Sequence, residues 1–294
     1  MFRKGFNMTL KEWLRRALEE KWAIPHFNIS TLEQLKAMVN VAKRVGSPLH
    51  IGTSGGEAKY LGMRQAVYLV RAYREEAGLP IFLNADHFHS IEDAKMAIDA
   101  GYDSINIDLS ELPYEENIKG TKEVVEYAKF KDADISAEGE LGHLLGSSEL
   151  QEKVIDVKPE DMTDPDQAIQ FLAQTGIDRL APAVGNLHGI AANAKSLDFE
   201  RIAALRDILP KEVSLVLHGG SGIDNEQVKK AIGLGMNNVH INTEIRVAYA
   251  ESLRKTLADN PNETTPYKIF PPVFAAMEKV IEEKIKLFGA NNRI

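Results

Sequence analysis

Eight short apolar segments alternate with segments of helical periodicity along this chain, and that alternation constrains the fold more than any other feature. We predict strands at residues 22–29, 48–53, 80–87, 102–109, 133–141, 177–184, 213–218 and 237–243. Strands that alternate with helices form parallel sheets, and a count of eight favours a (β/α)8 TIM barrel over an open doubly wound sheet. No Gly-x-Gly-x-x-Gly pattern follows the first strand, which weakens the dinucleotide-binding alternative.

Residues 1–294 are expected to form a single domain, because no internal linker divides the chain. Segment 142–165 interrupts the alternation with a polar, charged run that has no clear period. Loops of that length in compact domains are usually lids or disordered stretches, so we predict a mobile active-site loop. Extra C-terminal helices are predicted within residues 244–294, after the eighth strand.

Local signals place some helix boundaries. Capping boxes that begin at Thr9 and Ser30 are expected to open the first two helices. A loop is expected at Gly55-Gly56, before a helix at about 64–77.

Charge and cysteine content exclude several classes of function. The formal net charge of −8 disfavours generic binding to nucleic acid or to an anionic membrane. The chain has no cysteine, so it has no disulfide, thiolate nucleophile or thiolate metal site. No segment approaches the roughly 20 apolar residues of a membrane span, and the N-terminus lacks the apolar core of a signal peptide. We therefore expect a cytoplasmic protein.

All eight histidines lie in or just after predicted strands: His26, His50, His87, His89, His143, His188, His218 and His240. The catalytic groups of barrels come from the C-terminal ends of strands. His87, His188 and His218 each close a strand or the turn after it, and three imidazoles with an open position suit a catalytic Zn²⁺. The alternative for any one of them is a half-buried histidine with a satisfied hydrogen bond.

Acidic residues also end the predicted strands. They are Asp86, Asp108, Glu138, Glu140 and Glu244. We expect that one of these carboxylates orients a metal-binding histidine. The alternative for the others is that they are surface acids at the mouth of the barrel. Asp86 and His87 are neighbours, and neighbouring residues of a regular strand point to opposite faces. We therefore predict that the strand ends or is bulged at Asp86.

A glycine-rich segment follows strand seven as His-Gly-Gly-Ser-Gly, residues 218–222, and Asn242-Thr243 ends strand eight. The loops after these two strands form the usual phosphate site of barrels, where backbone N–H groups at a helix start favour an anion. No lysine lies within the eight predicted strands. A Schiff-base mechanism is therefore disfavoured, and carbanion chemistry in this barrel needs a metal as electron sink.

With these residues in view, the chain resembles the class II, metal-dependent fructose-bisphosphate and tagatose-bisphosphate aldolases over residues 22–289. The resemblance lies in PHFNIS (25–30), ADH (85–87), SINIDLSELPYEENIKGTKEVVEYA (104–128), AEGELG (137–142), AVGNLHG (183–189), LVLHGGSGI (215–223) and NTE (242–244).

The resemblance implies a barrel enzyme that cleaves a ketose 1,6-bisphosphate, most simply fructose 1,6-bisphosphate, to dihydroxyacetone phosphate and glyceraldehyde 3-phosphate. By the same resemblance His87, His188 and His218 bind Zn²⁺ or another divalent metal, and Asp86 is the catalytic acid/base. Asp108 and Glu140 match further acids of the metal site, either as outer partners of its ligands or as an alternative metal position. In the family, the dihydroxyacetone phosphate end of the substrate binds at positions that match Gly189, Gly219, Ser221, Asn242 and Thr243. A monovalent cation (Na⁺ or K⁺) often lies beside it.

Several positions depart from the family pattern. Phe88 stands where relatives commonly have glycine, and the loop acid of relatives has its nearest counterpart in Glu149. The Tyr-Lys that often follows His-Gly is absent, and Asn242 and His240 replace other residues. We take Arg246, or else Arg254, as the contact for the distal phosphate because both follow strand eight closely.

Three other functions remain as alternatives: tagatose 1,6-bisphosphate or a related sugar phosphate as substrate, a non-catalytic sugar-phosphate binding barrel, and metal-dependent hydrolysis. The last is disfavoured because a run of acids flanking a bridging lysine is missing. Relatives are dimers or larger, so a homodimer or homotetramer is expected, with the C-terminal helices at its interface.

Overall fold

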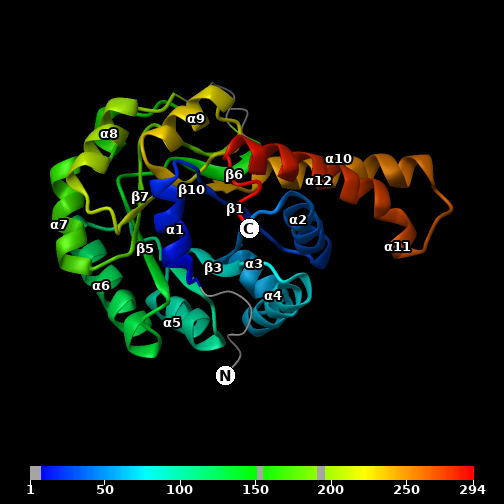
Figure 1. Ribbon diagram of the computed structural model, residues 1–294, viewed down its shortest axis with the longest axis horizontal. Helices are drawn as coiled ribbons and strands as arrows, with labels where there is room; N and C mark the ends of the chain where they lie inside the picture. Colours follow the sequence, from blue (N-terminus) through cyan, green and yellow to red (C-terminus); the bar gives the residue numbers. More distant parts are fainter. Residues whose placement is uncertain (1–7, 151–154, 191–195) are drawn as a thin grey trace.

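The computed structural model describes residues 8–150, 155–190 and 196–294. Eight parallel strands close into a barrel in the order β1-β10-β9-β7-β5-β4-β3-β2 (Figure 1). The strands are β1 (Ile24–Asn28), β2 (Leu49–Ser54), β3 (Ile81–Phe88), β4 (Ser104–Ile107), β5 (Ser136–Leu141), β7 (Arg179–Pro182), β9 (Ser214–Leu217) and β10 (Met236–Ile241). Each lies within one of the predicted apolar segments or extends it by one residue. The predicted (β/α)8 barrel is confirmed.

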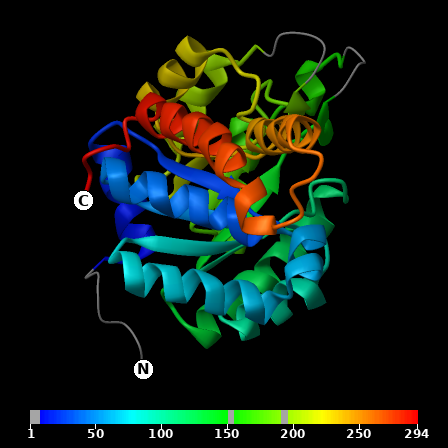
Figure 2. The same ribbon diagram turned by 90° about the vertical axis from the view of Figure 1, so that its right-hand side faces the viewer.

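Helices surround the barrel (Figures 1 and 2). They are α1 (Leu10–Glu19), α2 (Leu32–Val45), α3 (Gly55–Leu61), α4 (Met63–Ala77), α5 (Ile91–Ala100), α6 (Tyr114–Lys131), α7 (Pro165–Thr175), α8 (Phe199–Ile208), α9 (Asn225–Gly233), α10 (Thr243–Asp259), α11 (Pro266–Ile269) and α12 (Pro271–Leu287). None of the described helices combines the length and apolar content that crossing a bilayer requires.

Helix α1 packs across the N-terminal end of the barrel. Its capping box is formed by Thr9 and Glu12, as predicted. The side chain of Asn237, at the start of β10, donates a hydrogen bond to the backbone carbonyl of Leu14 at 2.8 Å. The functional site therefore has to open at the opposite end, where the strands terminate.

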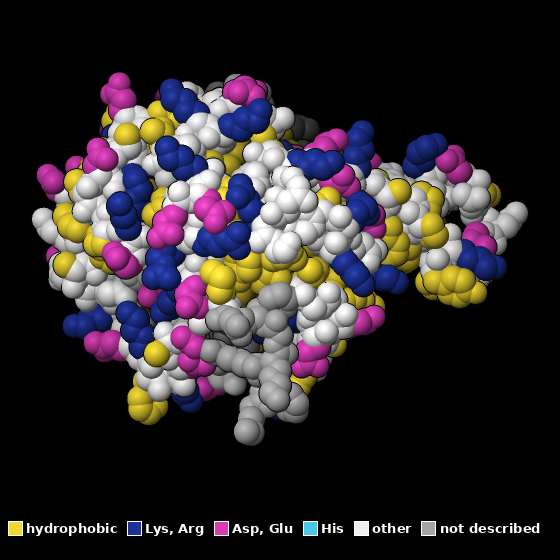
Figure 3. All heavy atoms as spheres, viewed as in Figure 1, with side chains coloured by type: hydrophobic (Ala, Val, Ile, Leu, Met, Phe, Trp, Pro, Cys, Tyr) yellow, Lys and Arg dark blue, Asp and Glu magenta, His cyan; other side chains and the backbone are white. Residues whose placement is uncertain are grey.

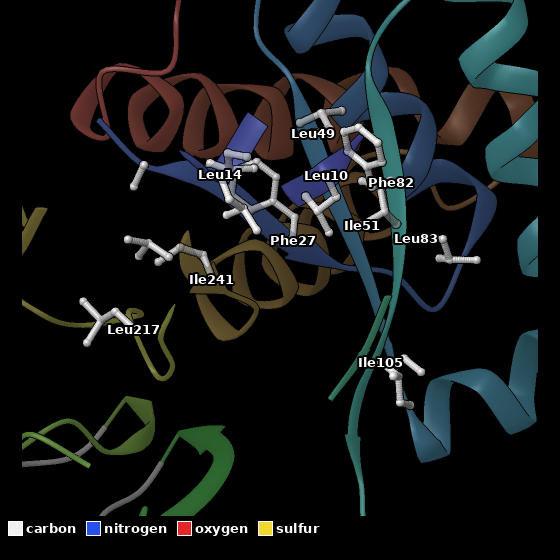
Figure 4. Close-up of a cluster of buried hydrophobic side chains, with 14 of the residues drawn as sticks. Leu10, Leu14, Phe27, Leu49, Ile51, Phe82, Leu83, Ile105, Leu217 and Ile241 are labelled. Carbon is white, nitrogen blue, oxygen red and sulfur yellow. The ribbon is translucent and has the colours of Figure 1, made fainter. Parts of the chain in front are cut away.

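The hydrophobic core lies between the outer face of the barrel and the helices. Figure 4 shows part of it, with side chains from α1 and six strands: Leu10, Leu14, Phe27, Leu49, Ile51, Phe82, Leu83, Ile105, Leu217 and Ile241. The alternate residues of the same strands point into the barrel, and many of them are polar and buried. Barrel interiors are normally filled by branched apolar side chains, so this polar interior is a distinguishing feature of the chain.

Helices α10 and α12 pack against each other and extend beyond the barrel as an arm (Figures 1 and 2). The short helix α11 lies at the far end of this arm. We call residues 243–287 the C-terminal arm. Its two long helices confirm the expected helical content of this region.

The structure corrects three local predictions. Segment 142–165 is not irregular throughout, because it contains β6 (Gly146–Leu150) and a 3-10 turn at Pro159–Asp161. β6 pairs in parallel with β8 (His188–Ile190), and that pairing partner is remote in sequence. Gly55 and Gly56 begin α3 rather than forming a loop, since Ser54 and Glu57 form a capping box there. The cap of α2 is Thr31 with Gln34, one residue after the predicted Ser30.

Candidate active site

Strand β3 is irregular at the predicted position. The pairing of β3 with β4 shifts register between Ala85 and Phe88, and His87 has a left-handed backbone with φ of 51°. This bulge lets Asp86 and His87 both face the cavity, which a regular strand forbids. Phe88 returns to the hydrophobic core and is 2% exposed, so it does not line the cavity. The prediction of a break at Asp86 is confirmed.

Three imidazoles converge at the C-terminal end of the barrel. Nε2 of His87 lies 3.1 Å from Nε2 of His188 and 2.7 Å from Nδ1 of His218. These residues come from β3, from β8 and from the turn after β9. Two nitrogens bound tetrahedrally to one zinc ion are about 3.4 Å apart. Three imidazole nitrogens at this spacing are therefore a donor set that fits a divalent ion such as zinc.

The outer nitrogens of two of these imidazoles face carboxylates. Nε2 of His218 lies 2.6 Å from Oε1 of Glu138. Nδ1 of His87 lies 2.8 Å from Oε1 of Glu140 and 3.2 Å from Oδ2 of Asp108. An outer carboxylate fixes the tautomer and orientation of a metal-binding imidazole. Asp108 and Glu140 thus contact the side of His87 that faces away from the other two histidines.

The same charges shift the pKa values of the imidazoles. Burial alone would lower the pKa of His87, but the carboxylates of Glu140 and Asp86 raise it well above its ordinary value. Burial, together with the charges of His87 and His218, lowers the pKa of His188 well below its ordinary value. His188 is therefore neutral at pH 7, which is the form that binds a metal.

Asp86 is buried beside this cluster and is held on both carboxylate oxygens. Asn28 donates to Oδ2 at 2.9 Å, and Nδ1 of His240 lies 3.3 Å from Oδ1. Burial would raise the pKa of Asp86, yet the charges of His26 and His87 and the contact with His240 lower it well below its ordinary value. An ionised, oriented carboxylate at the cavity wall has the properties of a general base.

The cavity brings together most of the predicted site residues. Its lining comprises Asn28, Asp86, His87, His188, Gly189, His218, Gly219, Ser221, His240, Asn242 and Thr243. Thr243 is the first residue of α10, so the N-terminus of a 17-residue helix faces this cavity. Gly219 has φ of 62°, and a Cβ atom there would lie 2.1 Å from the carbonyl oxygen of Leu187. Only glycine allows this close approach of two backbones.

Some predicted positions are not part of this lining, and one cannot be placed relative to it. Arg246 is exposed on the first turn of α10 and does not line it. Glu149 belongs to β6, but its side chain lies outside the described residues. Glu244 contacts Lys284 of α12 at 2.7 Å and accepts from the backbone of Gly222, so it joins α10 to α12.

Several residues near the site were not predicted from the sequence. The amide of Asn28 donates to Asp86 and also to Oε2 of Glu57, at 3.0 Å. His240 touches Asp86 and stacks on His26. Arg179 lies fully buried inside the barrel. The polar residues recur at every second position of the strands, and this periodicity was the signal for an inward-facing polar network.

A second histidine cluster in the barrel, formed by His26, His50 and His240, is not a suitable metal site. The rings of His26 and His240 stack at 3.5 Å with an angle of 8° between their planes. Nitrogen lone pairs lie in the ring plane, so two stacked parallel rings cannot both point at one ion. Both nitrogens of His50 are already bonded, to Ser104 and to Asn238.

Comparison with known proteins identifies the family. The family model described as class II fructose-bisphosphate aldolase matches residues 8–293. A fructose-bisphosphate aldolase from Geobacillus stearothermophilus is 37% identical over 291 residues, which cover 97% of this chain and 98% of that protein. The chain belongs to the class II fructose-bisphosphate aldolase family. The predicted family is confirmed, and the convergent imidazoles of this aldolase agree with the metal dependence of the class.

Solved structures agree with this assignment. The YdjI aldolase from Escherichia coli K12 superposes with a TM-score of 0.82 at 31% identity, covering 97% of this chain and 98% of that one. A Coccidioides immitis protein assigned as a fructose-1,6-bisphosphate aldolase gives a TM-score of 0.84 at 27% identity, with 99% of each chain covered. This chain is therefore an aldolase, a carbon–carbon lyase.

Proposed function

We propose that this class II aldolase catalyses the reversible, zinc-dependent cleavage of a ketose 1,6-bisphosphate. Fructose 1,6-bisphosphate is the preferred candidate, and the products are then dihydroxyacetone phosphate and glyceraldehyde 3-phosphate. The observation that carries the proposal is the convergence of His87, His188 and His218 beside the buried carboxylate of Asp86. Tagatose 1,6-bisphosphate or a related sugar phosphate is the second candidate, because no described contact fixes the configuration at C4.

His87, His188 and His218 would hold the divalent ion, with Glu138, Glu140 and Asp108 orienting the rings. The bound ion supplies a Lewis acid for the negative charge that develops on the substrate carbonyl as the C3–C4 bond breaks. Asp86 takes the proton from the C4 hydroxyl during cleavage and returns it during condensation. Its contacts with Asn28 and His240 keep the carboxylate oriented for that transfer.

The phosphate of the dihydroxyacetone end would bind at the N-terminus of α10. Gly189, Gly219, Ser221, Asn242 and Thr243 line this side of the cavity. Backbone N–H groups and the helix dipole favour an anion there, and a Na⁺ or K⁺ ion beside it would add to that attraction. Arg246, one turn into α10, is the proposed contact of the distal phosphate. Segment 142–165, of which residues 151–154 lie outside the described part of the chain, is the proposed cover of the cavity, with Glu149 moving the proton on the dihydroxyacetone carbon.

The test of this function is a comparison of two substrates. The rate of triose phosphate release should be higher with fructose 1,6-bisphosphate than with tagatose 1,6-bisphosphate, both assayed at saturation through a coupled dehydrogenase. A reversed order would assign the tagatose sugar, and no cleavage of either by the zinc-loaded protein would reject a ketose bisphosphate as substrate.

We also propose that the C-terminal arm contacts a second copy of the chain, in a homodimer or homotetramer. Leu257 is 46% exposed and Tyr267 is 76% exposed on the arm, where Figure 3 shows apolar side chains at the surface. Apolar groups that project from a domain are common at protein interfaces. Sedimentation equilibrium should give a mass of two or four chains, and Leu257→Glu combined with Tyr267→Glu should lower it. A monomeric wild-type protein would contradict this prediction.

A further inference from the structure

Arg179 is an unusual residue for the inside of a barrel. It opens β7, is completely buried, and points its guanidinium among polar side chains of other strands. Nη1 lies 2.7 Å from Oε2 of Glu138, and Nη2 donates to Oδ1 of Asn84 at 3.0 Å. A longer contact of 3.4 Å joins Nη1 to Asn238. The guanidinium thus joins four strands: β7, β5, β3 and β10.

Stability is a weak explanation for this ion pair. Replacing a buried pair with apolar side chains of similar volume is often neutral or stabilising, because two charges lose their hydration. Arg179 also leaves its Nε atom without a hydrogen-bond partner among the described residues, which is a further cost of burial. Another explanation for the pair comes from the other carboxylate oxygen of Glu138, Oε1, which contacts His218.

Glu138 connects the guanidinium to the imidazole cluster. Its Oε2 atom faces Arg179, and its Oε1 atom lies 2.6 Å from Nε2 of His218. Oε1 also accepts from Asn106 at 2.7 Å. The inner nitrogen of the same ring, Nδ1, is the one that approaches His87. A hydrogen bond from Nε2–H to Glu138 leaves Nδ1 as the free acceptor, which is the tautomer that can bind a metal.

We propose that Arg179 is a positioning residue for the metal centre: it holds Glu138 as the charged acceptor that orients His218 toward the ion. The inference rests on the proposed function only in taking His87, His188 and His218 as the metal site. Without the guanidinium, Glu138 would be a buried charge without its counter-ion, and nothing would hold its carboxylate from the Oε2 side. His218 would then lose its fixed orientation.

Metal affinity is the direct test. Competition between the protein and a chromophoric chelator gives the dissociation constant for Zn²⁺ without any substrate. Arg179→Met should weaken Zn²⁺ binding by about 10- to 100-fold, the range found when the outer partner of a metal ligand is removed. Arg179→Lys keeps the positive charge and should recover much of that loss. The absorption spectrum of the Co²⁺-loaded protein should change in Arg179→Met as well, because the geometry around the ion is altered.

Arg206→Met is the matched control. Arg206 is only partly buried, and it donates to the backbone carbonyls of Leu209, Pro210 and Val213, remote from the histidines. If Arg179 were only structural, both methionine variants would lower the melting temperature of the metal-free protein and leave the Zn²⁺ dissociation constant unchanged. That result would overturn the inference.

A second variant covers the case in which Arg179→Met does not fold. Glu138→Gln removes the charge and keeps the shape of the side chain, so it should weaken Zn²⁺ binding in the same direction, and unchanged affinity would overturn the inference. His87→Ala distinguishes a failure of the proposed metal site from a failure of the role of Arg179. Wild-type protein that binds Zn²⁺ no better than His87→Ala would reject the metal site itself, whereas normal binding by wild type and by Arg179→Met rejects only the role of Arg179.

Discussion

Removal of the divalent metal should lower the rate of ketose bisphosphate cleavage by about 10³-fold or more, because Lewis-acid stabilisation is worth several kcal/mol. No lysine lies in the eight described barrel strands, so a Schiff base formed from one of them cannot replace the metal. The measurement is triose phosphate release after dialysis against EDTA, with metal content determined on the same sample. Added Zn²⁺ should restore the rate.

The control for this prediction is His188→Ala. It removes one of three converging nitrogens, so added Zn²⁺ should restore far less activity than in the wild-type protein. Full activity in a sample shown by metal analysis to be free of divalent ions would contradict the proposed mechanism. Equal rescue of His188→Ala and wild type would contradict the assignment of His188 as a ligand.

Asp86→Asn should lower kcat by about 10²–10⁴-fold, the usual contribution of a general base. The substitution keeps the shape of the side chain, and the amide oxygen can still accept from Asn28, so substrate binding should be largely retained. Since the environment of Asp86 lowers its pKa, wild-type Asp86 is ionised at neutral pH and supplies the base without prior loss of a proton. Steady-state kinetics should show a loss in kcat with little change in KM.

Asp103→Asn provides the comparison for that variant. Asp103 is partly buried, just before β4, where it pairs with Arg74 and accepts from the backbone of Leu83. Its substitution should alter thermal stability and leave kcat almost unchanged. A normal kcat in Asp86→Asn, with Zn²⁺ content equal to that of the wild type, would remove Asp86 from the reaction.

Much of the fold was predictable because its signals are local. Apolar segments, capping boxes and strand-end histidines are each contained within a few residues, and together they indicated the eight strands and the cavity. The bulge at Asp86 and His87 followed from stereochemistry alone, since two adjacent functional residues cannot share a face of a regular strand. The carboxylate partner of a metal-binding histidine was expected among the strand-end acids, and Glu138 and Glu140 contact His218 and His87.

What the sequence did not reveal depends on contacts between distant segments. β6 exists through its pairing with β8, and the two are about forty residues apart in the chain. Arg179 lies in a short apolar segment, where an arginine is usually taken for a residue at the edge of a strand. Its burial follows from the place of β7 between β5 and β9 in the closed barrel. The contacts of His240 with Asp86 and of Glu57 with Asn28 also join segments that are distant in the sequence.

The pairing of β6 with β8 has a thermodynamic consequence. His188 begins β8, and its backbone N–H donates to the carbonyl of Leu145 at 2.9 Å, next to the register pair of Gly146 with His188. One imidazole of the proposed metal site is thus attached to a ladder whose other strand belongs to segment 142–165. Coupling of this kind is reciprocal. Occupancy of the proposed ion site would therefore stabilise the ladder, and a substitution that unpairs the ladder would weaken ion binding by up to the same coupling free energy, although it touches no imidazole.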